Sequence, residues 1–74
     1  MEKTLDLHGI GHADVFQKVD QFIGQHIIKG TMSVEIITGY SPKMKSIVNE
    51  VLQDYDLTSE DSWMNNGKLV IKMT

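Results

Sequence analysis

Residues 33–55 read SVEIITGYSPKMKSIVNEVLQDY, and this stretch decides the fold. Its first part, residues 33–38, is short and rich in β-branched side chains, which favours a strand. In the turn that follows, Ser41 is a typical N-terminal cap of a helix, and Pro42 suits the first helical position. The apolar residues after Pro42 recur every three or four positions as far as Tyr55. The stretch therefore predicts a strand, a glycine-containing turn and an amphipathic helix.

The same succession of elements precedes this stretch. Leu5 and Leu7 alternate with polar residues across residues 4–8, which predicts a strand. Across residues 12–29 the apolar positions recur at helical spacing, which predicts a helix with one buried stripe. Gly30 stands where a left-handed residue would end that helix.

The last part of the chain predicts a hairpin. Residues 57–64 are mostly polar and are interpreted as an edge strand anchored by Trp63. The sequence Asn-Asn-Gly at 65–67 is typical of a hairpin turn. Residues 68–73 alternate between polar and apolar side chains, which predicts the final strand.

These elements predict one domain over residues 1–74, with the order strand, helix, strand, helix, strand, strand. Crossovers between parallel strands are right-handed, so both helices are expected on the same face of the sheet. The predicted fold class is therefore an α/β (α+β) two-layer sandwich with a four-stranded mixed sheet. Leu5 and Leu7 would point at the helices, and Asp6 and His8 would lie on the open face.

Length and composition exclude several classes of protein. A chain of 74 residues has room for one small core, which excludes enzymes with a cleft between domains. There is no cysteine, so disulfides, thiolate zinc sites and thiol nucleophiles are excluded. The N-terminus lacks the apolar core of a signal peptide, and no apolar run approaches the roughly 20 residues of a membrane span. We therefore expect a cytoplasmic protein with no membrane partner.

The charge balance does not by itself indicate nucleic acid. Ten acidic residues outnumber seven basic ones, the net charge is −3, and every basic residue is a lysine. Asp54, Asp56, Glu60 and Asp61 are interpreted as a solvated acidic flank that would repel phosphate. Any contact with nucleic acid is therefore expected away from that flank.

Asp6 and His8 are the first candidates for chemistry. Two residues apart on a strand, they would share a face, with Cα atoms about 6.6 Å apart. A carboxylate and an imidazole at that spacing can share a proton, orient a water or hold a divalent ion. The alternative is that both are solvated groups, or that His8 hydrogen-bonds to the following loop. One carboxylate and one histidine are too few ligands to specify a tight metal site, so a divalent cation such as Mg²⁺ or Mn²⁺ stays an open question.

The junction between the second strand and the second helix is another candidate site. The free N–H groups and the dipole of a helix N-terminus attract anions such as phosphate. Lys43 and Lys45 would add positive potential, and Tyr40 could stack on a base. The alternative is an ordinary Ser-Pro cap in a tight loop. The candidate binding residues are His12, Thr38, Gly39, Tyr40, Ser41, Lys43, Lys45 and Lys68.

Two further histidines have simpler interpretations. His12 could join His8 across the turn at residues 9–11, giving two imidazoles suited to acid–base chemistry on a phosphodiester. The alternative is a polar residue at a helix start. His26 falls near the apolar stripe of the first helix and is interpreted as a partly buried packing residue.

Three motifs resemble those of the small MutS-related (Smr) domain family over almost the whole chain. Residues 5–9, LDLHG, match the family signature without change. Residues 37–40, ITGY, are similar to the second motif, usually Thr-Gly-x-Gly, and the helix that continues with Met44-Lys45 is similar to the family's Leu-Arg start. Residues 66–71, NGKLVI, resemble the closing turn and strand.

The resemblance implies a fold similar to the C-terminal domain of bacterial translation initiation factor three, with binding or endonucleolytic nicking of DNA or RNA as the activity. It implies Asp6 and His8 as the catalytic candidates and Thr38 and Gly39 as the loop close to phosphate. Lys45 would occupy a basic position that arginine usually fills.

Three departures from the family pattern affect how the chain would hold a substrate. Ser41 replaces the second glycine of Thr-Gly-x-Gly, the loop after that motif is short, and no arginine is present to clamp phosphate with two hydrogen bonds. A non-catalytic nucleic-acid or ribosome-associated module and a protein-interaction module therefore remain alternatives. Domains of this family are often attached to larger proteins, so a protein partner could supply targeting, and the domain itself is expected to be a monomer.

Overall fold

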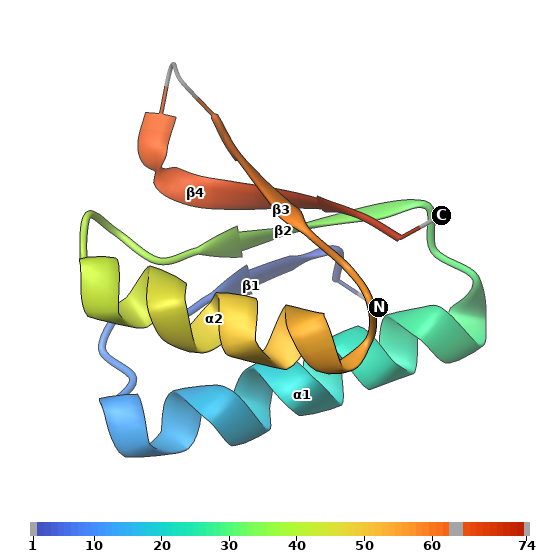
Figure 1. Cartoon of the computed structure of the whole chain (residues 1–74), viewed down its shortest axis with the longest axis horizontal. Helices are drawn as coiled ribbons and strands as arrows, with labels where there is room; N and C mark the ends of the chain where they lie inside the picture. Colours follow the sequence, from blue (N-terminus) through green and yellow to red (C-terminus); the bar gives the residue numbers. More distant parts are fainter. Residues whose placement is uncertain (1, 63–64, 74) are drawn as a thin grey trace.

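The structure is a computed structural model that describes residues 2–62 and 65–73. Its elements are β1 (Thr4–Asp6), α1 (His12–Lys29), β2 (Ser33–Ile37), α2 (Pro42–Asp54), β3 (Ser59–Ser62) and β4 (Asn65–Lys72). They form one four-stranded mixed sheet with both helices against the same face (Figure 1). The predicted order of elements and the fold class are confirmed, while the likeness to the initiation-factor domain stays a prediction.

The strand pairing places the ends of β1 and β2 next to each other, beside Lys68 of β4. The strand order is β1-β2-β4-β3, with β1 parallel to β2 and β4 antiparallel to both of its neighbours. Asp6 at the end of β1 pairs with Ile37 at the end of β2, and Ile37 pairs with Lys68 of β4. The turns that follow β1 and β2 therefore leave the sheet side by side.

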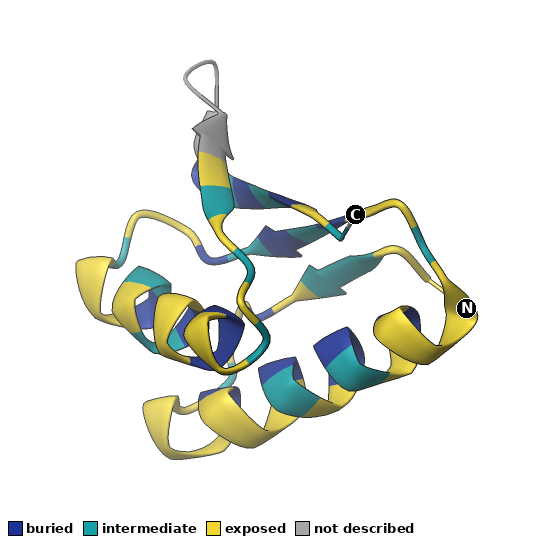
Figure 2. Cartoon of the chain, turned by 45° about the vertical axis from the view of Figure 1, so that its right-hand side comes forward, coloured by how far each residue is buried: buried dark blue, intermediate teal, exposed yellow. Residues whose placement is uncertain are grey.

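The hydrophobic core lies between the sheet and the two helices. Figure 2 shows the buried residues on the sides of the helices that face the sheet. The core residues are Leu7, Val15, Val19, Phe22, Ile23, Val34, Ile36, Met44, Val48, Val51, Leu52, Leu69 and Ile71. Among the described residues, no helix is long and apolar enough to cross a membrane.

Helix α1 has the predicted limits, and its last turn is tied to the N-terminal segment by His26. Gly30 ends the helix in the left-handed conformation with φ of 74°. The His26 ring is only 1% exposed, with Nε2 2.8 Å from the carbonyl oxygen of Glu2 and Nδ1 2.7 Å from the hydroxyl of Thr31. A carbonyl oxygen only accepts, so Nε2 carries a proton here. The sequence predicts a partly buried His26, whereas the structure buries it fully. Full burial is tolerated because both ring nitrogens have hydrogen-bond partners.

The first strand is shorter than the alternation predicted. β1 ends at Asp6, and His8 and Gly9 lie in a turn that is closed by the Ile10 N–H donating to the Leu7 carbonyl at 3.0 Å. Gly9 has φ of 79°, a backbone conformation that residues other than glycine rarely adopt. The prediction that the strand continues to His8 is wrong, and strand alternation does not set the direction of the His8 side chain.

The predicted turn at residues 65–67 is also wrong. β4 already begins at Asn65, which pairs with Ser62. Trp63, the predicted anchor, lies outside the described residues. The register shifts between Asp61 and Ser62, because Asp61 pairs with Leu69 and Ser62 with Asn65. Residues 66–68 thus form an irregular segment inside β4. In this segment the Gly67 carbonyl accepts two N–H groups from the turn after β2.

Tyr55, at the end of α2, forms a hydrogen bond that links this helix to α1. Its hydroxyl donates to Oδ1 of Asp20 at 2.8 Å. Gly24 lies beside this contact, and a Cβ atom at that position would be 3.4 Å from the Tyr55 oxygen. The hydrogen bond to the Asp20 carboxylate, with burial, raises the pKa of Tyr55 above its ordinary value. The contact therefore favours the neutral phenol in the folded protein.

Replacing Tyr55 with phenylalanine is expected to lower the free energy of unfolding by about 1 kcal/mol at pH 7, because one hydrogen bond to a charged group is lost. Since the folded-state pKa lies above the unfolded value of about 10, this contribution is fully present below pH 10 and is lost as the pH rises through the raised pKa. Urea unfolding of both proteins at pH 7 and pH 11 measures the difference. The same difference at both pH values would contradict the assignment.

Candidate functional site

The turn after β1 is built around Asp6 and His8. Asp6 Oδ1 accepts a hydrogen bond from the backbone N–H of His8 at 2.8 Å, and both side chains are exposed. Leu7, between them, is fully buried, and its N–H donates to the Ile37 carbonyl at 3.0 Å. The Asp6 carboxylate therefore holds the backbone of His8, an exposed residue that directly follows the contact between Leu7 and the end of β2.

The turn after β2 is linked to β4 by two backbone hydrogen bonds. The N–H groups of Thr38 and Gly39 both donate to the Gly67 carbonyl, at 2.8 and 3.0 Å. Thr38 is 6% exposed, and its hydroxyl donates to the Gly39 carbonyl at 3.0 Å. Gly39 has φ of 65°, which glycine adopts at no steric cost. Because the Thr38 hydroxyl is used inside the turn, a ligand that approaches this turn would first meet Gly39 and the exposed Tyr40.

The start of α2 has the cap that the sequence predicted. Ser41 Oγ accepts a hydrogen bond from the Met44 N–H at 3.1 Å, and Pro42 occupies the first helical position. Lys43 is exposed and Lys45 is half-buried. No acidic residue lies in the first turn of α2. This helix end therefore combines the positive end of the helix dipole with lysine side chains.

The start of α1 is less favourable to an anion. Gly11 precedes the helix without a side-chain hydrogen bond, and the exposed His12 is the first helical residue. Asp14 adds a negative charge to the first turn. A negative ligand at this edge would thus be drawn toward α2 more strongly than toward α1.

Lys68 lies at the same edge, on the open face of the sheet. Its Nζ is 3.4 Å from Oε2 of Glu35, and both side chains are partly exposed. In the sheet Lys68 pairs with Ile37, so it stands beside the turn after β2. The neighbouring carboxylate offsets part of the positive charge that Lys68 would offer to a phosphate.

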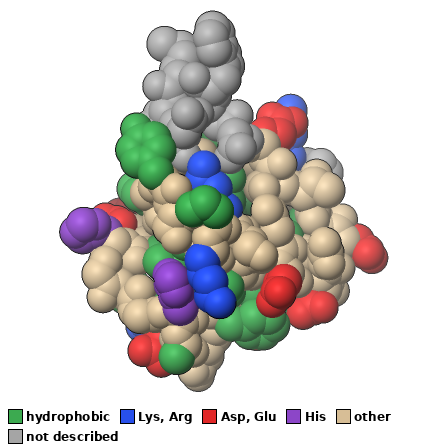
Figure 3. Space-filling view, turned by 60° about the vertical axis from the view of Figure 1, so that its left-hand side comes forward, with side chains coloured by type: hydrophobic (Ala, Val, Ile, Leu, Met, Phe, Trp, Pro, Cys, Tyr) green, Lys and Arg blue, Asp and Glu red, His purple; other side chains and the backbone are tan. Residues whose placement is uncertain are grey.

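The candidate residues thus gather at one end of the molecule. We call this surface the loop end; it comprises residues 8–12, 38–45 and 67–68. Figure 3, which brings this side forward, shows histidine and lysine side chains on the surface there. Asp54 and Asp56 of the acidic flank lie at the other end of α2, a helix length from the loop end. Glu60 and Asp61 lie on β3, where they pair with Val70 and Leu69 of β4, so this half of the flank is closer to Lys68.

The carboxylates and histidines of the loop end do not make a ready metal cage. Among residues 2–62 and 65–73, no three histidine or acidic side chains group closely enough to hold a metal ion. One Asp6 oxygen is already engaged by the His8 N–H. Mg²⁺ takes six oxygen ligands in octahedral geometry, so most of them would have to come from water or a substrate.

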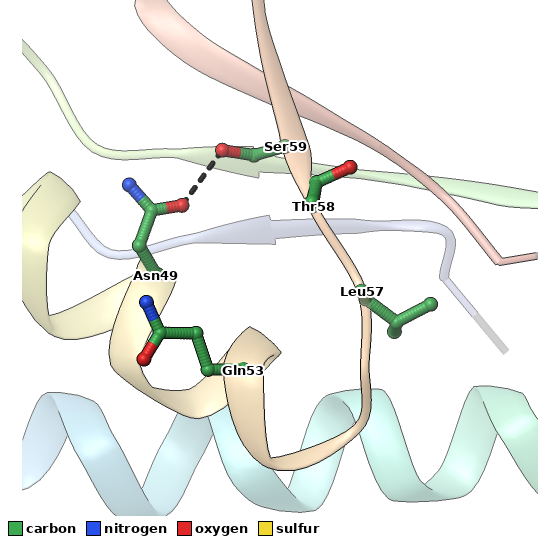
Figure 4. Close-up of a pocket in the computed structure, with 5 residues that line it drawn as sticks. All are labelled: Asn49, Gln53, Leu57, Thr58 and Ser59. Carbon is green, nitrogen blue, oxygen red and sulfur yellow. Dashed lines mark hydrogen bonds between the residues drawn. The ribbon is translucent and has the colours of Figure 1, made fainter.

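A cleft lies away from the loop end and was not predicted from the sequence. It has a volume of about 300 Å³ and lies between the second half of α2 and the start of β3 (Figure 4). Ser59 Oγ donates to Asn49 Oδ1 across it at 2.8 Å. Its lining residues are Asn49, Gln53, Leu57, Thr58 and Ser59. These residues form no motif, so the sequence carried no signal for the cleft.

Comparison with known proteins agrees with the three motifs. The family model of the Smr domain matches residues 5–72, nearly the whole chain. No curated protein and no solved structure matches the chain. The family is nucleic-acid-binding and nuclease-related. Because the match runs from Leu5 on β1 to Lys72 on β4 and so includes every element of the fold, the chain belongs to the Smr domain family.

Proposed function

We propose that the chain binds DNA or RNA through the loop end. The observation that carries this proposal is the convergence of His8, His12 and Lys43 with the uncapped start of α1 and the Ser41-capped start of α2. Positive helix ends beside exposed cationic or imidazole groups attract phosphate. The family membership supports the same ligand class.

The electrostatics favour contact on this surface over the rest of the molecule. With a net charge of −3, the chain as a whole repels a polyanion. Lys43, Lys45 and Lys68 nevertheless lie at the loop end, and two acidic residues of the flank, Asp54 and Asp56, lie at the far end of α2. Few lysines can contact phosphate at once, so the affinity should fall with salt, but with a shallow slope.

Cleavage of a phosphodiester by His8 extends this proposal. The exposed imidazole can take a proton from an attacking hydroxyl or give one to the leaving oxygen. Asp6 then serves as a positioning residue, because its bond to the His8 N–H fixes the backbone from which the ring extends. This account uses no metal ion for any step.

A binding module without cleavage is the second candidate function. Two observations favour it. The Asp6 carboxylate accepts a hydrogen bond from the backbone N–H of His8, and Lys68 forms a salt bridge with Glu35. Both groups are thereby engaged within the protein. The two candidates share the same surface and differ only in whether His8 transfers a proton.

An NMR titration of the labelled chain tests the binding surface. A short branched DNA and a structured RNA are added at low and at physiological salt, with and without magnesium. We expect backbone amide shifts at residues 8–12, 38–45 and 68, and smaller shifts at physiological salt. No shifts with either polymer would overturn the proposal and point to a protein partner.

Replacing Lys43 with glutamine is expected to weaken binding to every nucleic acid sequence alike, and to reduce the slope of log affinity against log salt by about 1. The physical reason is that one phosphate contact is lost and no base contact changes. Lys29→Gln is the matched control, since Lys29 is also an exposed helical lysine but lies in the last turn of α1, away from the loop end. Equal effects of the two substitutions would show that net charge matters and that the loop end does not.

A further inference from the structure

Tyr40 is exposed to an extent that the packing of the domain does not explain. Its side chain is 76% exposed, against 43% for Phe16, so it is the most accessible phenyl or phenol ring among the described residues. Other strongly exposed apolar side chains, Ile28 and Met32, lie near the opposite end of α1. Among the described residues of the loop end, Tyr40 is the one that exposes a large flat aromatic ring.

The backbone on both sides of Tyr40 is fixed. Before it, the N–H groups of Thr38 and Gly39 donate hydrogen bonds to the Gly67 carbonyl. After it, Ser41 caps α2 and Pro42 begins the helix. A ring that extends from such a turn has only its own two side-chain torsions to lose on binding, so contact with a ligand costs little conformational entropy.

The surroundings of the ring suit a nucleotide. Lys43 follows three residues later and is exposed, and the start of α2 carries positive potential without an acidic residue in its first turn. A phosphate held at this helix end would place the attached sugar and base within reach of a side chain on the preceding turn. Aromatic side chains beside a positive surface are the usual platform for bases of single strands.

We propose that Tyr40 stacks on an unpaired base, and that the chain therefore prefers single-stranded or unpaired nucleic acid over uninterrupted duplex. This inference rests on the proposed binding function and deepens it. In a duplex both faces of each base are covered by its neighbours, so only an unpaired base can offer a face to the ring. Phosphate contacts are common to both forms, and with few lysines they are weak; stacking decides between the forms.

Fluorescence anisotropy with matched probes tests the preference. The probe is one fluorescein-labelled 12-nucleotide strand of mixed sequence, used alone and annealed to its complement, once as DNA and once as RNA. We expect the free strand to bind at least about tenfold more tightly than the duplex, since stacking on an aromatic side chain contributes on the order of 1–3 kcal/mol per base. The DNA and RNA arms show which sugar the site accepts.

Two variants assign the preference to the ring. Tyr40→Ala is expected to weaken binding of the free strand about tenfold or more and to leave duplex binding within about twofold, whereas Tyr40→Phe keeps the preference. Ile28→Ala, which removes an 88% exposed side chain elsewhere, should change neither affinity. Amide spectra of the variants show whether the fold is kept.

The outcomes separate this inference from the function on which it rests. Equal affinity of the unaltered chain for strand and duplex, or an equal loss on both forms in Tyr40→Ala, overturns the stacking role and leaves phosphate binding in place. If the unaltered chain binds none of the probes, the proposed function itself fails.

Discussion

Replacing Ile36 with alanine is expected to lower the free energy of unfolding by about 2–5 kcal/mol. Ile36 is 0% exposed and lies on β2, between Leu5 of β1 and Leu69 of β4. Truncating it leaves a cavity between the sheet and the helices. A chain of 74 residues has a total stability of about 4–11 kcal/mol, so the variant should lose a large part of it. Urea unfolding followed by circular dichroism measures the loss.

Ile28→Ala is the control for that experiment, because it makes the same chemical change at a side chain that is 88% exposed. It is expected to change the stability by no more than about 0.5 kcal/mol. Similar losses in the two variants would contradict the assignment of Ile36 to the core.

Replacing His8 with alanine is expected to lower the rate of phosphodiester cleavage about 10²- to 10⁴-fold, which is the usual contribution of a side chain that transfers a proton. Since His8 is exposed and lies in a turn, the free energy of unfolding should stay nearly unchanged. The measurement is the appearance of cut strands on a denaturing gel, with branched DNA and structured RNA as substrates.

Three comparisons make this experiment decisive. His12→Ala removes the other exposed imidazole of the loop end and should cost less. Asp6→Asn keeps an oxygen that can accept the His8 N–H and should retain most of the rate, while Asp6→Ala should not. Unchanged cleavage in His8→Ala contradicts proton transfer by this ring, and no cleavage by the unaltered chain favours the binding module.

The fold could be predicted where local signals agree with the tertiary structure. The limits of α1 were correct because its apolar spacing and Gly30 mark the same end. The turn at residues 65–67 was misplaced because Asn-Asn-Gly satisfies the local rule for a hairpin. What decides there is contact with a segment distant in the sequence: Lys68 pairs with Ile37 of β2, and the Gly67 carbonyl accepts the N–H groups of Thr38 and Gly39 in the turn after β2.

The place of the candidate site could be predicted from the sequence, but the hydrogen bonds that its side chains make could not. The motifs at residues 5–9 and 37–40 gave the two turns, and the parallel pairing of β1 and β2 brings them together. That Asp6 bonds to the His8 backbone, and that the Thr38 hydroxyl is used within its own turn, depends on short distances that no residue spacing encodes.

The contact between His26 and the carbonyl of Glu2 has a consequence for how the domain can be attached to other molecules. It holds the start of the chain near the last turn of α1, and the N–H of Met73 donates to the carbonyl of Met32 in the same region, so both marked ends lie on one side in Figure 1. Residues 8–12 and 38–45 lie at the other ends of α1 and β2. A tag, a surface tether or a fused domain joined beside Glu2 or Met73 therefore points away from an approaching strand and leaves its path open.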